Sequence, residues 1–305
     1  MKGRVLKSTG SWMQVERDQE APVSCRVRGA LRLRGIDSTN PIAVGDVVTW
    51  ELQDDGTGVI TDIDDRKNYI IRKSVKLSKQ TQILAANIDI AWLVVTPAFP
   101  KTSTGFIDRF IAAAESFRIP CGLLFNKSDL FTGDLEAIQD EFIAIYEPLG
   151  YRCFKVSANT GQGIAGLRDI FKDKVNLLAG HSGVGKSSLI NALEPGFNLK
   201  TGDISRQHLK GKHTTTFAEM HQLSFGGYLI DTPGIREFVN IDFKPAEIGH
   251  YFVEIRERMQ QCRFNNCLHD NEKDCAVKEA VARGDINRER YYNYMSMLRN
   301  EDIFR

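Results

Sequence analysis

The chain has 305 residues, of which 42% are hydrophobic and 26% are charged, and its formal net charge at pH 7 is +1. This length and composition allow one full α/β core with two smaller domains, whereas the near-zero net charge excludes a global electrostatic field as the source of any RNA affinity. No apolar run approaches the length of a membrane-spanning helix, so we expect no membrane contact and a cytoplasmic location.

The first 75 residues predict a small β-barrel. Short runs rich in β-forming residues alternate here with turns and show no helical periodicity. The predicted strands are Arg4 to Leu6, Ser11 to Glu16, Ser24 to Arg34, Asp46 to Leu52 and Gly58 to Ile63. Several short strands in close succession are typical of an OB-type barrel, so we expect an OB-like domain over residues 1–75.

One of these predicted strands carries a basic face. Side chains at alternate positions of a strand share one face, and the arginines between Ser24 and Arg34 stand at even-numbered positions: Arg26, Arg28, Arg32 and Arg34. Residues 66–80 add further lysines and arginines and no acid. Such a face can follow the phosphate backbone of RNA. An ordinary solvated strand is the alternative interpretation.

The following segments predict part of a nucleotide-binding sheet. Ile90 to Thr96 is a strand pattern, Gly105 to Phe117 a helix pattern, and Gly122 to Phe125 a second apolar strand. This strand delivers an NKxD sequence, Asn126-Lys127-Ser128-Asp129, to its carboxyl end, where open α/β sheets bind ligands.

The NKxD sequence decides which nucleotide base is recognised. The Asp129 carboxylate would accept hydrogen bonds from guanine N1 and N2, which adenine cannot donate. Asn126 would brace the loop, and Lys127 would lie along the base. A helix pattern around Asp134 to Leu149 follows, and then Ser157-Ala158 after the short run Phe154 to Val156 would offer a backbone N–H to guanine O6.

A complete phosphate-binding P-loop follows. Its residues are Gly180, His181, Ser182, Gly183, Val184, Gly185, Lys186 and Ser187, followed by Ser188. An apolar strand from Lys174 to Ala179 precedes the P-loop, and a predicted helix from Ser187 to Leu193 continues it. Glycines let backbone N–H groups turn toward phosphate oxygens, and the helix adds its positive N-terminal end. Lys186 would bridge the β- and γ-phosphates of GTP, and Ser187 would bind Mg²⁺.

A DxxG element, Asp231-Thr232-Pro233-Gly234, follows the predicted strand Tyr228 to Ile230. Asp231 would hold Mg²⁺ through water, and the Gly234 N–H would contact the γ-phosphate. Between the P-loop and this element lies a threonine-rich segment, Gly211 to Thr216, where switch I belongs. Thr215 or Thr214 would complete the magnesium shell there, and a polar turn is the alternative interpretation.

The residue after Gly234 is Ile235, where Ras-like GTPases carry a glutamine that orients the attacking water. An alkyl side chain cannot hydrogen-bond water, so we expect slow intrinsic hydrolysis and another group that positions the nucleophile. His213 is the catalytic candidate, acting with Lys186, because a neutral imidazole accepts or orients a proton near neutral pH. His181 in the P-loop is the weaker alternative.

The order of these motifs is unusual. NKxD follows the P-loop in an ordinary GTPase, but here it comes about fifty residues earlier. A compact domain has nearby surface termini, so the same sheet can form with its ends rejoined elsewhere. The sequence therefore predicts a circularly permuted P-loop GTPase domain of the α/β class over residues 76–240, whose switch II leads directly into the C-terminal region.

That region, residues 241–305, predicts a helical domain stapled by zinc. Cys262, Cys267, His269 and Cys275 have the spacing C-x4-C-x-H-x5-C, and three thiolates with one imidazole fill a tetrahedral structural site. Disulfides are the rival interpretation, disfavoured by the reducing compartment that P-loop chemistry indicates. Helical spacing recurs over Ile248 to Met259 and over Tyr291 to Leu298. A region this short needs such a staple because it cannot bury a large core.

These features together resemble the RsgA (YjeQ) family of circularly permuted GTPases in small ribosomal subunit biogenesis. Besides the motif order, the resemblance includes Val44-Gly45-Asp46-Val47-Val48 near the start, Ala85-Ala86-Asn87-Ile88-Asp89 in the linker, and the cysteine–histidine cluster. It implies binding to the small (30S) subunit and its 16S rRNA, with GTP hydrolysis to GDP stimulated by that subunit and release coupled to late maturation. We also expect a monomer.

Two other functions fit parts of the pattern. A GTP-dependent binding module without relevant turnover is favoured by Ile235. A P-loop ATPase or small-molecule kinase is disfavoured by Asp129, and no signature of a substrate pocket is evident.

Overall fold

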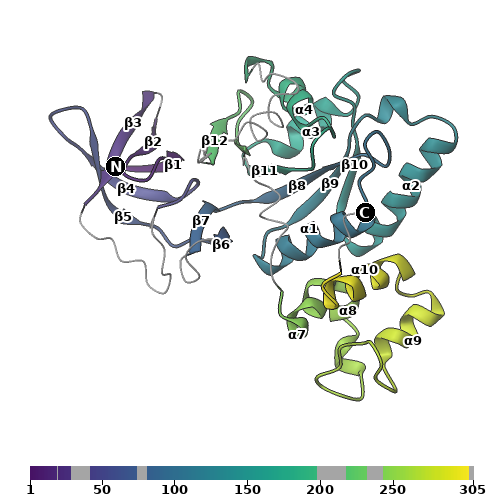
Figure 1. Cartoon of the computed structure of the whole chain (residues 1–305). Coiled ribbons are helices and arrows are strands. Elements are labelled where there is room, and N and C mark those ends of the chain that lie inside the picture. Colours follow the sequence, from purple (N-terminus) through teal and green to yellow (C-terminus); the bar gives the residue numbers. More distant parts are fainter. Residues whose placement is uncertain (19, 29–41, 74–80, 198–217, 232–242, 302–305) are drawn as a thin grey trace.

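The computed structural model describes residues 1–18, 20–28, 42–73, 81–197, 218–231 and 243–301, and Figure 1 shows three structural parts. A β-barrel stands at the N-terminal end of the chain. A twisted sheet with helices on both faces forms the middle. Helices α7 (Pro245–Ile248) to α10 (Arg288–Leu298) pack below α1 (Thr104–Ser116) of that middle part. The predicted combination of a barrel with a permuted α/β GTPase domain is confirmed.

The barrel is built from β1 (Lys2–Ser8), β2 (Met13–Arg17), β3 (Glu20–Val27), β4 (Val47–Leu52) and β5 (Gly58–Ile63). The strands follow the order β1-β2-β3-β5-β4, and pairing of β1 with β4 closes the circle. Alternate side chains point inward and form a core that includes Val5, Val15 and Trp50. The predicted strand Ser24 to Arg34 is displaced: β3 begins at Glu20 and ends at Val27, and residues 29–41 lie outside the described residues.

A two-stranded hairpin, β6 (Tyr69–Lys73) and β7 (Thr81–Ala86), joins the barrel to the middle part. The side-chain amide of Asn68 both donates to the Ile88 carbonyl and accepts from its N–H, each at 2.8 Å. Ile70 of β6 enters the same hydrophobic cluster as the central sheet. The predicted boundary after residue 75 falls between two paired strands, and it stays a prediction.

The central sheet has the order β10-β9-β8-β11-β13-β12. Its strands are β8 (Ile90–Val95), β9 (Cys121–Phe125), β10 (Arg152–Lys155), β11 (Val175–Ala179), β12 (Glu219–Gln222) and β13 (Tyr228–Asp231). All neighbours are parallel except β12, which pairs antiparallel with β13. Parallel strands need crossover connections, and the helices in those connections cover both faces of the sheet.

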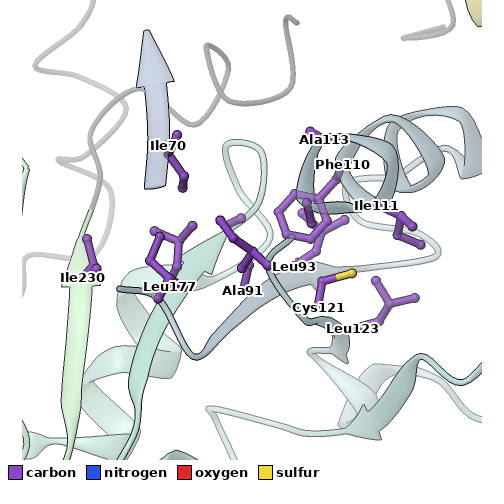
Figure 2. Packing of buried hydrophobic residues seen from close by; sticks show 14 of the residues in the cluster. Ile70, Ala91, Leu93, Phe110, Ile111, Ala113, Cys121, Leu123, Leu177 and Ile230 are labelled. Atoms are coloured by element: carbon purple, nitrogen blue, oxygen red, sulfur yellow. The ribbon is translucent and has the colours of Figure 1, made fainter. Parts of the chain in front are cut away.

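The two faces of β8 show how the helices are distributed. Ala91 and Leu93 belong to a cluster with Phe110 of α1 (Thr104–Ser116), as Figure 2 shows, and that cluster also holds Tyr146 of α2 (Asp134–Tyr146). Trp92 and Val94 belong to a second cluster with α3 (Ile164–Phe171) and α4 (Lys186–Leu193). β8 is therefore buried on both sides, which explains its continuous apolar sequence.

The C-terminal part contains α7 (Pro245–Ile248), α8 (Val253–Arg256), α9 (Ala276–Arg283) and α10 (Arg288–Leu298). The helix pattern over Tyr291 to Leu298 is observed as α10. The helix expected over Ile248 to Met259 is wrong as a continuous helix, because Phe252 takes an extended backbone with φ −107° and ψ 108° between two short helical pieces. Ile248, Phe252 and Ile255 are all buried, so the broken segment still serves as a packing face.

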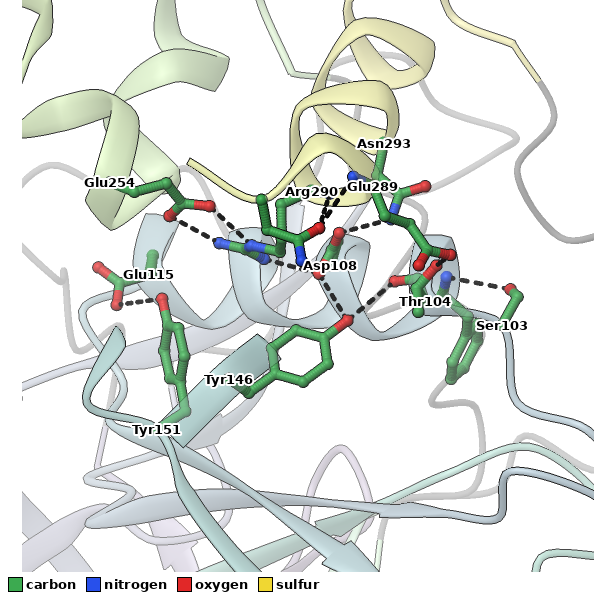
Figure 3. Close-up of polar contacts among 12 residues, drawn as sticks. Ser103, Thr104, Asp108, Glu115, Tyr146, Tyr151, Glu254, Glu289, Arg290 and Asn293 are labelled. Carbon is green, nitrogen blue, oxygen red and sulfur yellow. Dashed lines mark hydrogen bonds and ion pairs between the residues drawn. The ribbon is translucent and has the colours of Figure 1, made fainter. Parts of the chain in front are cut away.

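A buried ion cluster fastens this part to α1, as Figure 3 shows. The Arg290 guanidinium of α10 donates to Asp108 of α1 at 2.6 Å and to Glu254 of α8 at 2.7 Å and 2.9 Å. Asn293 and Tyr146 also donate to the Asp108 carboxylate. Three ionised side chains that are almost fully buried thus meet at one interface.

Of the helices that the structure describes, none has the length and apolar character to cross a membrane.

Candidate functional site: a nucleotide site and a metal centre

The predicted nucleotide loops converge at one edge of the central sheet. The strands β9, β10 and β11 are parallel neighbours of β8 or of one another, so their carboxyl ends lead to Asn126, Ser157 and Gly180 on the same side. The Asn126 side-chain amide donates to the Val184 carbonyl at 2.9 Å, and its oxygen accepts from the Ala158 N–H at 3.2 Å. One buried side chain thus joins the NKxD loop, the SA loop and the P-loop.

The conformation of the P-loop explains its glycines. Gly185 has φ +91°, and a Cβ atom there would lie 2.5 Å from Asn126 Nδ2. Gly180 has φ +148°, and its Cβ would lie 2.7 Å from the Val94 carbonyl oxygen. Any side chain at either position would therefore disturb the loop. The side chain of Lys186 folds back onto the loop, and its ammonium donates to the Gly180 carbonyl at 2.5 Å and to the His181 carbonyl at 2.9 Å.

The NKxD loop is held by hydrogen bonds to neighbouring segments. Lys127 adopts φ +62°, and its ammonium donates to the carbonyls of Phe99 at 2.7 Å and Gly183 at 2.8 Å. The carboxylate of Asp129 accepts from the Ser157 hydroxyl at 2.5 Å, which fixes its orientation beside the SA loop. Ser157 is fully buried and Asp129 is half-buried, so the carboxylate lies at the rim of the site.

Sequence reasoning missed one residue beside this site. Thr102 follows β8 in the chain and is only 1% exposed. Its hydroxyl is 2.8 Å from Nε2 of His181. It stands in a segment without a recognisable motif, Thr96 to Thr104. Its place after the carboxyl end of a parallel strand was the available signal. The His181 imidazole faces Thr102 and the edge of the Phe106 ring, and this contact ties it to α1.

Several predicted residues lie outside the described residues. These are His213, Thr214, Thr215 and Gly234. The backbone of Asp231 ends β13, next to β11 and its P-loop. Ser187 and Ser188 are half-buried in the first turn of α4. The catalytic role of His213 and the magnesium-binding roles of Ser187, Thr215 and Asp231 stay predictions.

The residues of the second predicted site form a compact cluster of possible metal ligands. The ligand atoms of Cys262, Cys267, His269 and Cys275 all lie within 4.8 Å of one another, and all four residues are buried. His269 Nδ1 is 3.6 Å from Cys262 Sγ and 3.4 Å from Cys275 Sγ, while those two sulfurs are 3.8 Å apart. All six cysteines are described, and all are free thiols, as the metal interpretation requires.

These separations can be compared with ideal geometry. Tetrahedral bonds of the usual zinc–sulfur and zinc–nitrogen lengths place two sulfurs about 3.8 Å apart and sulfur and nitrogen about 3.6 Å apart. Burial raises the pKa of the Cys267 thiol to about 12 and lowers the pKa of His269. A cation that stabilises thiolates offsets this cost of burial. The cluster can therefore hold a metal ion.

The surrounding residues hold the cluster in place. The hydroxyls of Tyr291 and Tyr294 on α10 donate to the carbonyls of His269 at 2.6 Å and Leu268 at 2.9 Å. Cys275 is the N-cap of α9. The cysteine–histidine cluster and the Arg290 ion cluster are thus both bound to α10, which is the helix that meets α1.

The predicted RNA-binding arginines are only partly described. Arg26 lies at an exposed position of β3, and its guanidinium stacks over the ring of Trp12 at 3.9 Å from the centroid. Arg28 is exposed just after the strand, with one guanidinium nitrogen 4.0 Å from Glu51. Arg32 and Arg34 lie outside the described residues. The basic face therefore stays a prediction.

Comparison with known proteins decides the family. A family model described as RsgA GTPase matches residues 63–240, and one described as RsgA N-terminal domain matches residues 2–60. The chain belongs to the RsgA GTPase family. The predictions of a GTPase and of the RsgA resemblance are confirmed.

Relatives of the RsgA family match nearly the whole chain. A small ribosomal subunit biogenesis GTPase RsgA from Bacteroides fragilis is 52% identical over 302 residues, covering 99% of this chain and 97% of the relative. A protein of the same name from Flavobacterium psychrophilum is 49% identical over 308 residues, covering 99% and 94%.

Solved structures show the same architecture. YjeQ from Thermotoga maritima superposes with a TM-score of 0.82 at 37% identity, over 98% of this chain and 97% of that one. YloQ, described as a circularly permuted GTPase, superposes with a TM-score of 0.76 at 30% identity, over 98% and 94%. The permuted order of the motifs is therefore a property of the fold to which this chain belongs.

Proposed function

We propose that this protein binds the small (30S) ribosomal subunit and its 16S rRNA and assists late maturation of that subunit by hydrolysing GTP. The observation that carries the proposal is the joining of the NKxD, SA and P-loop segments through Asn126, within a chain that is 52% identical to a small ribosomal subunit biogenesis GTPase. A site that recognises guanine and phosphate together suits a factor whose grip on its partner depends on GTP.

In this proposal each loop has its own task. Asp129 selects guanine, with Asn126, Lys127, Ser157 and Ala158 around the base, and residues 180–188 surround the phosphates. Mg²⁺ is held by Ser187, Thr215 and Asp231, and it neutralises charge that develops on the phosphates during transfer. The geometry of Asp129 beside Ser157 supports the assignment of the base site, because the two loops meet where a guanine edge would lie.

Hydrolysis is slow in the free protein because Ile235 cannot orient water, and the small subunit accelerates it. His213 positions the attacking water once the partner is bound. A His213→Ala variant is expected to bind GTP normally and to lose most of the stimulated turnover. Unchanged stimulated turnover in this variant would remove His213 from the mechanism.

The other two parts of the chain provide contacts with RNA and rigidity. The barrel offers Arg26 and Arg28 to phosphates, and the stacked pair Arg26–Trp12 supports an RNA-facing surface because aromatic and guanidinium planes accept bases. One structural Zn²⁺ at Cys262, Cys267, His269 and Cys275 stabilises the C-terminal part. The protein acts as a monomer in the cytoplasm.

The proposal is tested by sedimentation with purified small subunits in the presence of a non-hydrolysable GTP analogue or GDP, together with a GTP hydrolysis assay. We expect co-sedimentation with the analogue, weaker association with GDP, and turnover that rises when subunits are added. Turnover that is the same with and without subunits, combined with GTP-dependent association, would instead favour a binding module without relevant hydrolysis. Loss of association in both nucleotide states would contradict the proposal.

A further inference from the structure

Two threonines at the start of α1 contact two different parts of the molecule. The hydroxyl of Thr102 contacts His181 in the P-loop at 2.8 Å. Two residues later, the hydroxyl of Thr104 donates to Glu289 of α10 at 2.6 Å, as Figure 3 shows. Both threonines are buried, at 1% and 8% exposure. Two buried threonines that are two positions apart therefore bond to different parts of the molecule.

Thr102 is held on its backbone and on its side chain. Its N–H donates to the Thr96 carbonyl at 2.8 Å, and its hydroxyl oxygen accepts from the Thr96 N–H at 3.1 Å. Thr96 directly follows β8, which lies beside β11 in the central sheet. The position of the Thr102 hydroxyl is therefore set by the rigid sheet and not by a loop that moves independently.

The contacts of the His181 imidazole fit one neutral tautomer. Its Nδ1 lies 3.0 Å from the Ser182 carbonyl, which can only accept, so Nδ1 carries a hydrogen and donates. In the neutral ring, Nε2 then accepts from the Thr102 hydroxyl, whose oxygen already accepts from Thr96. The imidazole thus links Thr102 of the segment after β8 to Ser182 in the first half of the P-loop. The Phe106 ring packs against it in a T-shaped contact, with centroids 5.8 Å apart.

We propose that Thr102 is a positioning residue for the phosphates of GTP, acting on the P-loop through His181. This inference rests on the proposed function, in which residues 180–188 bind those phosphates. Backbone N–H groups bind phosphate well only when the loop is held in the binding geometry before the nucleotide arrives. Thr102 supplies that restraint on the first half of the loop, as Asn126 does on the second half through Val184.

The test compares three variants of the full-length protein, using fluorescent GTP and GDP analogues to measure affinity. Thr102→Val keeps the shape and removes the hydroxyl together with its hydrogen bonds to Thr96 and His181, and it is expected to weaken both nucleotides roughly tenfold, the effect of the lost contact with His181. Thr102→Ser keeps the hydroxyl and restores most of the affinity. Thr104→Val makes the same chemical change on the opposite side of the segment and leaves affinity within about twofold of wild type.

A double-mutant cycle with His181→Phe separates positioning from general damage to the fold. If Thr102 acts through His181, the double variant binds nucleotide no more weakly than the weaker single variant. Additive losses, an unchanged Thr102→Val affinity, or an equal loss in Thr104→Val would each overturn the inference. Failure of the wild-type chain to bind GTP would overturn the proposed function as well, whereas normal wild-type binding with an unaffected Thr102→Val would overturn the positioning role alone.

Discussion

Asn126 donates its side-chain amide to the carbonyl of Val184 at 2.9 Å, across 58 positions of the sequence. Its oxygen accepts at the same time from Ala158. Asn126 precedes the P-loop in this chain, although NKxD follows it in an ordinary GTPase, so the bond shows that the permuted order leads to the same spatial neighbourhood. The three loops therefore meet through one side chain, whatever their order along the chain.

Removing this side chain should loosen the whole nucleotide site. In Asn126→Ala, the loss of two buried hydrogen bonds should cost about 2 kcal/mol and lower the affinity for GTP and GDP by roughly 30-fold. Titration with fluorescent nucleotides measures this. Asn159→Ala is the matched control, because Asn159 is exposed and only reaches Asp129 at 3.5 Å. Equal losses in both variants would show that Asn126 has no special role.

Metal removal should destabilise the C-terminal part. A strong chelator should lower the melting temperature and expose Cys262, Cys267 and Cys275 to a thiol reagent, because structural zinc contributes directly to folding free energy. Cys25 serves as an internal control, since burial raises its pKa to about 11 and keeps it unreactive near neutral pH. Metal analysis of the purified protein should find one zinc ion per chain. Three reactive cluster thiols before chelation would rule out a bound metal.

The Arg290 ion cluster should be the most sensitive point of the α1–α10 interface. Arg290→Ala leaves Asp108 and Glu254 buried without their cation, and removal of one partner of a buried pair costs about 3–5 kcal/mol. Arg256→Ala removes an exposed pair with Glu115 and should cost less than about 1 kcal/mol. Chemical denaturation compares the two. Similar losses would mean that the buried cluster is not a principal source of stability.

Alkaline pH should weaken the contact between the barrel and β13. The Tyr228 hydroxyl donates to Glu16 of the barrel at 2.6 Å, and burial, together with that hydrogen bond and the charge of Glu16, raises the pKa of Tyr228 to about 12. The folded state therefore holds this proton more tightly than the unfolded state, whose tyrosine titrates near about 10. Stability from this group is present below about pH 10 and is lost as the pH rises toward about 12.

The Tyr228→Phe variant checks the origin of that loss. It cannot ionise at this position, so its melting temperature should fall less steeply over the same alkaline range than that of the wild type. Thermal unfolding at a series of pH values measures the difference. Parallel curves for the two proteins would assign the alkaline sensitivity to other groups.

The loops of the site were predictable because each motif follows a strand of clear apolar pattern, and carboxyl ends of parallel strands meet at one edge. Thr102 was not predictable as a site residue, since a lone threonine carries no motif and its partner His181 is 79 positions away. The pairing of Arg290 with Asp108 spans 182 positions and depends on tertiary packing that local patterns do not record. For the same reason, helical spacing over Ile248 to Met259 did not reveal the extended Phe252 that interrupts it.

Nucleotide selectivity of Asp129→Asn tests the central claim most directly, namely that residues 126–129 and 180–187 bind one guanine nucleotide together. Competition of GTP, ATP and xanthosine triphosphate against a fluorescent GDP analogue should show strong preference for GTP in the wild type. The variant should lose roughly tenfold or more of its GTP affinity and gain affinity for xanthosine triphosphate, because an amide can donate to the oxygen that xanthine carries in place of the guanine amino group. An unchanged preference for GTP in Asp129→Asn, or equal binding of ATP by the wild type, would contradict the account.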